Sequence, residues 1–144
     1  MTCRLDHFTI TAPSLQAGRD WLSGHLGVEP QAGGEHPRMG THNLLLRLGD
    51  SIYLEVIAVN PAAPHPGRPR WFELDRLRPD AMPRLSGWVA RTPDIEASLA
   101  DAREDLGIAV PMARSHLQWL ISIPEDGSLP LGGAGPTLIQ WQTN

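Results

Sequence analysis

Two residues that can hold a ligand or move a proton lie in apolar stretches of this chain: His7 in LDHFTI and Glu55 in IYLEVIAV. An imidazole can bind Zn, Ni, Mn or Fe through one nitrogen while an acceptor orients the other, or it can be a hydrogen-bonded pocket histidine. A carboxylate among apolar neighbours is costly unless it is paired, metal-bound or facing water in a cavity. We therefore expect Glu55 to face a functional cavity, or else to pair with Arg47 on a neighbouring strand.

A second group of polar residues lies in the loop GGEHPRMGTHN. Proline and glycine separate His36 from His42, which breaks the helical spacing of a two-histidine metal motif. Two histidines, Arg38 and free backbone amides in one loop suit an anionic or carbonyl oxygen. We expect these residues to bind substrate, with His42 also a candidate catalytic residue. The alternative is a structural turn in which Thr41 and Asn43, otherwise two further substrate-binding candidates, satisfy the local backbone.

The C-terminal part of the chain offers weaker candidates. Gln140, in TLIQWQ, is a neutral amide whose carbonyl oxygen can bind a hard cation, though more weakly than a carboxylate. Strand alternation groups Trp119 with core residues, so His116 and Gln118 point the other way and are expected to line a substrate cavity. The chain contains no G-x-S-x-G, P-loop, G-x-G-x-x-G or Cys-His pairing, so those chemistries are set aside.

An internal repeat organises the elements that must position these residues. The segments Leu5–Gly27 and Leu85–Gly107 align without a gap, with Phe8 on Trp88. His7 falls on Gly87, so only the first copy carries the imidazole.

The first copy begins a module of one strand, one helix and about three further strands. We expect a strand at Leu5–Thr11, followed by a helix that is capped by Ser14 and Gly27 and has an apolar stripe of Leu15, Leu22 and Leu26. Residues 28–40 can hold at most a short edge strand. Strands Thr41–Leu48 and Ser51–Val59 follow, joined by a tight hairpin at Gly49-Asp50.

The second copy begins the same order of elements. Its expected elements are strand Leu85–Arg91, helix Asp94–Leu106 and strands Val110–Arg114, Gln118–Ile123 and Thr137–Trp141.

The proline-rich segment 60–84 is expected to connect the two modules and to contain one short helical turn packed back on the core through its few apolar residues, Trp71, Phe72, Leu74 and Leu77. The predicted fold is α+β: two tandem βαβββ modules form a curled, cup-shaped mixed sheet with helices outside. We expect a single domain over residues 1–144, with module one at about 4–59 and module two at about 85–142.

Composition limits the compartment and the partners. The chain has 144 residues, one cysteine (Cys3) and no apolar run long enough to span a membrane, and MTCRLDHFT lacks the order of a secretory signal. We therefore expect a cytoplasmic protein with no membrane partner. A net charge of −4 with scattered arginines argues against nucleic-acid binding and favours a small-molecule substrate or ligand.

The segments LDHFTI, GGEHPRMGTHNLLLRLG, YLEVIA, RWFELD and LIQW resemble the vicinal oxygen chelate superfamily, and more closely its glyoxalase-like domain proteins. The resemblance implies a divalent metal in the cup, bound by residues from the first and last strands of each module. Carried onto this chain, those positions are His7, Glu55, Gly87 and Gln140. Relatives tend to carry an acid where this chain has Gln140, and Gly87 offers no ligand.

Three functional hypotheses follow. The first is a glyoxalase-like enzyme of the lyase or isomerase type, in which a divalent metal on His7, Glu55 and Gln140 polarises a carbonyl or enolate oxygen. In this hypothesis Glu55 is a ligand or, without metal, a general base. The second is a metal-free protein that binds or sequesters a small ligand in the same cup. The third gives the exposed connector a role as a homodimer surface.

Overall fold

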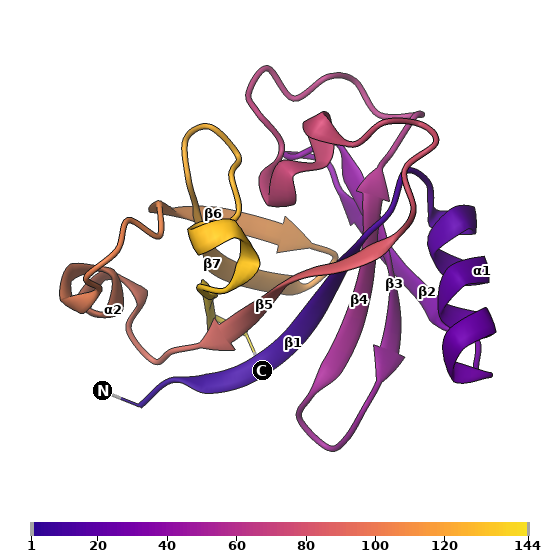
Figure 1. The fold of residues 1–144 in the computed structure, drawn as a ribbon. Helices are drawn as coiled ribbons and strands as arrows, with labels where there is room; N and C mark the ends of the chain where they lie inside the picture. The colour runs from indigo at the N-terminus through magenta and orange to yellow at the C-terminus, as the bar shows by residue number, and fades with distance from the viewer. Residues whose placement is uncertain (1, 144) are drawn as a thin grey trace.

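The computed structural model describes residues 2–143 and contains one mixed sheet of eight strands (Figure 1). Its spatial order is β2-β3-β4-β1-β5-β8-β7-β6. The strands are β1 (Arg4–Thr11), β2 (Gln31–His36), β3 (Thr41–Arg47), β4 (Tyr53–Val59), β5 (Arg84–Arg91), β6 (Ile108–Arg114), β7 (Leu117–Ile123) and β8 (Thr137–Trp141). The helices are α1 (Leu15–Leu26) and α2 (Ile95–Asp101), with 3-10 turns η1 (Trp71–Arg76) and η2 (Pro130–Gly133).

Strands β1 and β5, the first strands of the two modules, pair antiparallel at the centre of the sheet. The pairing register is symmetric about Phe8 and Trp88, which are partners in the ladder. Leu5 pairs with Ala90, and Leu85, the counterpart of Leu5 in the repeat, pairs with Ile10. The register therefore follows the alignment that the sequence repeat predicts.

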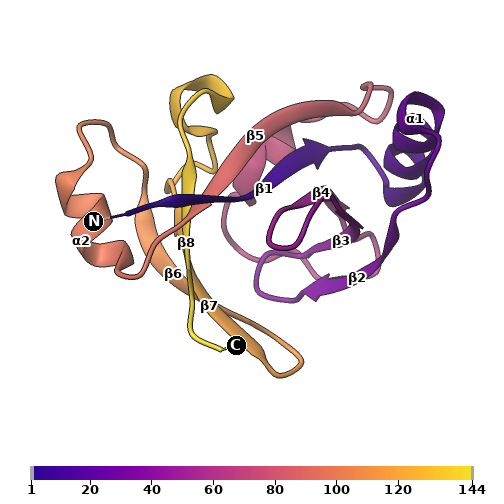
Figure 2. The same ribbon diagram turned by 90° about the horizontal axis from the view of Figure 1, so that it is seen from below.

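The sheet curls so that its two edge strands, β2 and β6, come into contact, and each module forms one wall of a cup (Figure 2). The helices α1 and α2 lie on the outside of this curl (Figure 1). The α+β cup predicted from the sequence is confirmed. No helix in the described part of the chain is long and apolar enough to cross a membrane.

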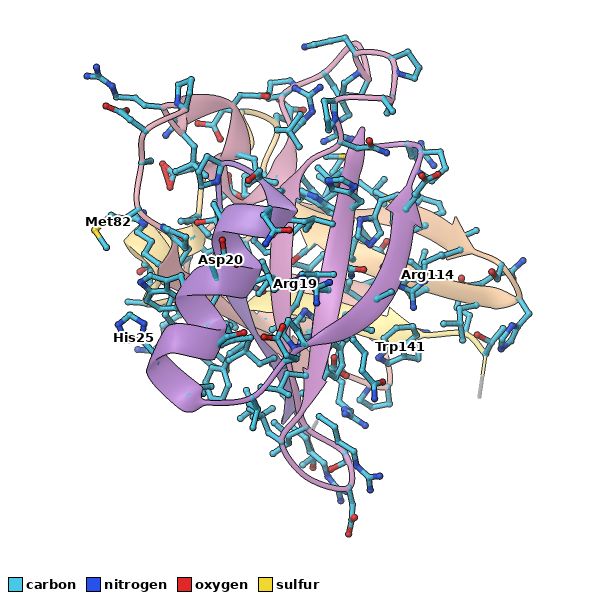
Figure 3. All side chains as sticks on the ribbon, turned by 90° about the vertical axis from the view of Figure 1, so that its right-hand side faces the viewer. Arg19, Asp20, His25, Met82, Arg114 and Trp141 are labelled. Atoms are coloured by element: carbon cyan, nitrogen blue, oxygen red, sulfur yellow. The ribbon has the colours of Figure 1, made fainter. Side chains whose placement is uncertain are left out.

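Helix α1 has the predicted caps. The Ser14 side chain accepts a hydrogen bond from the Ala17 amide, and Gly27 ends the helix with a left-handed φ of 69°. Leu22 is buried against the sheet, but Leu26 is 52% exposed, so the predicted apolar stripe is one turn too long. Figure 3 looks onto the polar outer face of this helix, where Arg19, Asp20 and His25 lie.

Helix α2 is shorter than predicted. Asp94 caps it as expected, but it ends at Asp101 and Ala102 is already extended. Leu106 lies beyond the helix and packs into a core cluster with Ile95. The sequence prediction was wrong here because an apolar residue at helical spacing can also be buried from a loop.

One connection differs from expectation and another agrees with it. The link between β3 and β4 spans residues 48–52 rather than two residues, because the amides of Leu48 and Gly49 both donate to the Ile52 carbonyl. Segment 60–84 contains the predicted short turn, η1, and its Trp71 and Phe72 are buried in the main core. A homodimer surface on this connector stays a prediction, and it would have to use other residues of the segment.

Candidate functional site: a buried imidazole and carboxylate in the cup

The site begins at the buried pair Asp6 and His7 on β1. The pairing register of β1 with β5 is irregular between Leu5 and His7, and both the Asp6 and the His7 side chains lie inside the protein. Asp6 Oδ1 lies 2.6 Å from His7 Nδ1, so the carboxylate fixes the orientation of the imidazole. The other Asp6 oxygen accepts from Trp141 Nε1 at 3.0 Å and lies 3.0 Å from Arg91 Nε.

Glu55 reaches the same place from β4, the strand parallel to β1. Its Oε1 lies 3.6 Å from His7 Nε2, and its Oε2 accepts a 2.8 Å hydrogen bond from Asn43 Nδ2 on β3. Glu55 is 6% exposed and His7 is 4% exposed. Glu55 does not pair with Arg47, whose guanidinium lies 3.0 Å from the exposed carboxylate of Asp50.

The two groups hold each other in their charged forms. Burial alone would lower the pKa of His7, but the hydrogen bond to Asp6 and the charge of Glu55 outweigh it and raise that pKa to about 9. Burial alone would raise the pKa of Glu55, but His7 and the hydrogen bond from Asn43 lower it to about 2. At neutral pH the site therefore contains an imidazolium facing a carboxylate.

His7 and Glu55 line a small hollow with a volume of about 40 Å³. That is room for about three waters or the reacting end of a small molecule. The lining residues are His7, His36, Asn43, Leu45, Tyr53, Glu55, Trp71, Phe72, Arg114, Trp119, Ile121, Ile139 and Trp141. Module one thus supplies the polar groups, while module two supplies apolar walls and one arginine.

His36 is a second imidazole in this lining, and it differs in charge from His7. Its Nδ1 lies 3.0 Å from the Thr41 hydroxyl, which also accepts from Trp71 Nε1 at 3.2 Å. Burial lowers the pKa of His36 to about 4, although the charge of Glu55 opposes this. His36 is therefore neutral at pH 7 and adds a hydrogen-bonding group rather than a charge.

A comparison with models of protein families matches residues 5–144 to the glyoxalase-like domain. The chain belongs to the glyoxalase-like domain family. A comparison with curated protein sequences finds no match.

Several solved structures share the fold of this glyoxalase-like domain. A hypothetical protein from Staphylococcus aureus superposes with a TM-score of 0.69 at 18% identity over 100% of this chain, which spans only 60% of that protein. Methylmalonyl-CoA epimerase from Mycobacterium tuberculosis gives 0.58 at 17% identity, covering 95% of this chain and 85% of that one. A methylmalonyl-CoA epimerase in complex with methylmalonyl-CoA and NH4+ gives 0.63 at 17% identity, covering 99% and 97%.

Gln140 of this glyoxalase-like domain does not join His7 and Glu55. Its Oε1 accepts a 2.8 Å hydrogen bond from the Ile95 amide at the start of α2, and it is absent from the cup lining. The strand pairings explain the error, because Thr9 pairs with Glu55 in module one and Val89 pairs with Thr137 in module two. The counterpart of Glu55 is therefore Thr137, and Gln140 lies on the other face of its strand.

The proposed substrate loop divides between the two faces of β3. Asn43 lines the cup, whereas His42 is not part of the lining, because alternation along the strand puts it on the outer face. The expectation that His42 acts in the cavity is therefore wrong. Thr41 is buried behind the lining and supports His36 there.

Three other substrate-binding candidates lie outside the cup. Arg38 and Gln118 line a shallow outer groove, where Arg38 donates to the Pro111 carbonyl at 3.0 Å. His116 lies in the turn after β6 and lines a separate outer groove. The alternation predicted for β7 was right, but the core face with Trp119 is the face that lines the cup.

Sequence reasoning missed four groups that shape the site. Asp6, Tyr53, Arg114 and Trp141 gave no separate signal, although Asp6 stands directly before the candidate imidazole. The Tyr53 ring stacks on His7 with ring centroids 4.5 Å apart. Burial raises the pKa of Tyr53, so its phenol stays protonated over the physiological range.

The donor set fits a divalent metal poorly. Catalytic zinc sites use three protein ligands, and no group of three His, Cys, Asp or Glu residues within 2–143 is arranged to hold an ion. Asn43 turns its amide nitrogen toward Glu55, while its oxygen accepts from the Gly34 amide at 2.9 Å. His7 and Glu55 thus converge, but the third ligand implied by the family resemblance points elsewhere.

Proposed function

We propose that this glyoxalase-like domain is a small-molecule enzyme of the lyase or isomerase type. It removes a proton from the carbon next to a carbonyl group and stabilises the enolate oxygen that forms. The observation that carries this proposal is the buried contact between His7 Nε2 and Glu55 Oε1, 3.6 Å apart beside a hollow. An acid and a base on one cavity wall are the two groups that enolisation requires.

His7 acts as the electrophile in this proposal. Its Nε2–H donates to the carbonyl oxygen of the substrate and stabilises the negative charge that builds up there. Asp6 accepts from Nδ1 at 2.6 Å and keeps Nε2–H directed into the cup. The apolar and aromatic walls from Trp71, Trp119 and Trp141 exclude water and strengthen this interaction.

Glu55 acts as the base. A separation of 3.6 Å is longer than a normal N–H···O hydrogen bond, so a substrate oxygen can replace Glu55 as the acceptor of His7 Nε2–H without breaking a tight bond. Once His7 turns to that oxygen, Glu55 loses part of the stabilisation that lowers its pKa and becomes a stronger base. The hydrogen bond from Asn43 keeps the carboxylate directed at the substrate.

This mechanism routes no step through a metal, because the donors in the cup do not fit one. The His7 imidazolium supplies the positive charge at the position where the family resemblance expects a cation. Structural neighbours named methylmalonyl-CoA epimerase support the reaction class, because an epimerase inverts a carbon centre. At 16% to 17% identity that support concerns the reaction class only.

Exchange of deuterium from D2O into small carbonyl compounds, followed by proton NMR, tests this function. We expect the protein, with chelator present, to speed exchange next to the carbonyl, and Glu55→Gln to abolish that acceleration. Asp50→Asn is the matched control, because Asp50 is an exposed carboxylate paired only with Arg47. If no compound in a broad panel exchanges faster than in buffer, the proposal fails.

The second candidate function is sequestration of a small aromatic ligand. Four of the aromatic side chains in the lining, those of Trp71, Phe72, Trp119 and Trp141, favour it, since aromatic rings can stack on a planar molecule. Tight binding of a planar ligand, detected by quenching of tryptophan fluorescence, together with no deuterium exchange into any carbonyl compound, would establish this second candidate.

A further inference from the structure

Arg114, the last residue of β6, brings a positive charge from module two to the polar wall of module one. Its Nη1 lies 3.4 Å from Asn43 Oδ1, a long contact to an oxygen that already accepts from the Gly34 amide at 2.9 Å. Figure 3 shows Arg114 and Trp141 at the same side of the molecule, and both line the hollow. The guanidinium is therefore held loosely, at a position that borders both the hollow and the outer groove that His116 lines.

No carboxylate among residues 2–143 neutralises Arg114 within 4.0 Å. The acids nearest the site are already engaged: Glu55 with His7 and Asn43, and Asp6 with His7, Trp141 and Arg91. A partly buried guanidinium without a counter-ion beside this small hollow is a binding group for an anion, and its fork of N–H donors matches a carboxylate.

We propose that Arg114 binds the carboxylate of a small oxo acid whose carbonyl group lies between His7 and Glu55. This inference rests on the proposed function and narrows its substrate to an anion. The distance between Glu55 and Arg114 is short, because the single side chain of Asn43 contacts Glu55 with its nitrogen and Arg114 with its oxygen. One short molecule can therefore reach both groups, and a hollow of about 40 Å³ selects short molecules.

Gly34 on β2 makes this position of Arg114 possible. A methyl group added at Gly34 would lie 2.3 Å from Arg114 Cδ and 3.0 Å from its Nε. The aliphatic part of the Arg114 side chain therefore occupies the space that a side chain at position 34 would fill. The atoms in the way belong to a flexible side chain rather than to backbone. Gly34→Ala should therefore displace the guanidinium while leaving the charge of the protein unchanged.

Binding of matched acid and ester probes tests the proposal on the full chain. Oxo acids of three to five carbons, beginning with pyruvate, are compared with their methyl esters by calorimetry and tryptophan fluorescence. We expect the acids to bind at least about tenfold more tightly than the esters. Arg114→Gln and Gly34→Ala should each remove this preference without weakening ester binding, whereas Arg78→Gln, at an exposed arginine paired with Asp80, should keep it.

The outcomes separate this inference from the proposed function. Equal affinity for acids and esters, a preference that survives Arg114→Gln, or no binding by any acid of the series overturns the assignment of Arg114. Deuterium exchange into esters alone would also overturn it while leaving the proposed function standing. Arg114-dependent binding of acids without exchange supports the anion site and contradicts the proposed chemistry.

Discussion

Asp6 and His7 are consecutive residues of one strand, yet both side chains lie inside the protein, with Oδ1 of the first 2.6 Å from Nδ1 of the second. Regular alternation would direct them to opposite faces of the sheet. The pairing register of β1 with β5 is irregular between Leu5 and His7, and the Asp6 and His7 side chains are both buried. The Asp6 carboxylate therefore contacts Nδ1 of the imidazole, while Glu55 faces its Nε2.

Removing the charge of Asp6 should therefore be costly. We expect Asp6→Asn to lower the free energy of unfolding by about 3 kcal/mol at pH 7, because His7 and Arg91 lose their shared buried partner. Asp50→Asn, at an exposed pair with Arg47, should change it by less than about 0.5 kcal/mol. Urea unfolding measures both, and equal effects would show that Asp6 contributes no more than a surface charge.

The stability of the protein should be greatest near pH 6.5. The raised pKa of His7 gives stability that is complete below 6.5 and is lost as the pH rises to about 9. The lowered pKa values of His36 and Glu55 give stability that is lost on acidification, from 6.5 to about 4 for His36 and from 4.5 to about 2 for Glu55. The free energy of unfolding should fall by about 1.4 kcal/mol per pH unit on each limb where one proton dominates.

The alkaline limb belongs to one residue and can be removed selectively. Urea unfolding of His7→Gln should show a flat profile between pH 6.5 and 9, while its acid limb persists. A wild-type profile that is flat over the same interval would mean that His7 is not protonated beyond its ordinary range.

Two glycines of α1 should respond to alanine with opposite signs. A methyl group at Gly18 would meet Val56 Cγ1 at 2.3 Å, whereas one at Gly24 meets nothing within 4 Å. We expect Gly18→Ala to destabilise the protein by about 1 to 3 kcal/mol through overpacking. Gly24→Ala should stabilise it by about 0.5 to 1 kcal/mol through helix propensity. Thermal unfolding measures the stability of both variants. Stabilisation by both substitutions would contradict the close packing of α1 on β4.

Gln140 should matter for folding and not for ligands. We expect Gln140→Leu to lower the free energy of unfolding by about 1 kcal/mol, because the Ile95 amide loses its acceptor. Binding of zinc, nickel or manganese, measured by calorimetry, should be the same in the variant and the wild type. Metal binding that weakens in the variant would place Gln140 in the cup after all.

Most strands could be predicted from sequence because each carries a local signal, whereas the glycine-rich β2 gave only a possible edge strand within 28–40. Alternation marks β1, and the cap residues Ser14 and Gly27 fix the ends of α1. The repeat also sets the register of β1 against β5. The end of α2 could not be predicted, because burial of Leu106 from a loop gives the same pattern as burial from a helix.

The site could be predicted only where a residue's face follows from alternation. The sequence indicated that His7 and Glu55 converge, and they lie 3.6 Å apart, while their catalytic roles stay predictions. Gln140 was placed on the wrong face because the counterpart of Glu55 was misassigned along β8. Arg114 reaches the cup only because the sheet curls until β6 meets β2, which no local pattern records.

The proton on His7, between Asp6 and Glu55, can be detected without knowing the substrate. NMR titration of the His7 ring from pH 5 to 11, with chelator present and the signal assigned by its loss in His7→Gln, gives the pKa directly. We expect a pKa of about 9 in the wild type and a lower pKa in Glu55→Gln. A wild-type value at or below 6.5, or one that does not change in Glu55→Gln, would contradict this expectation.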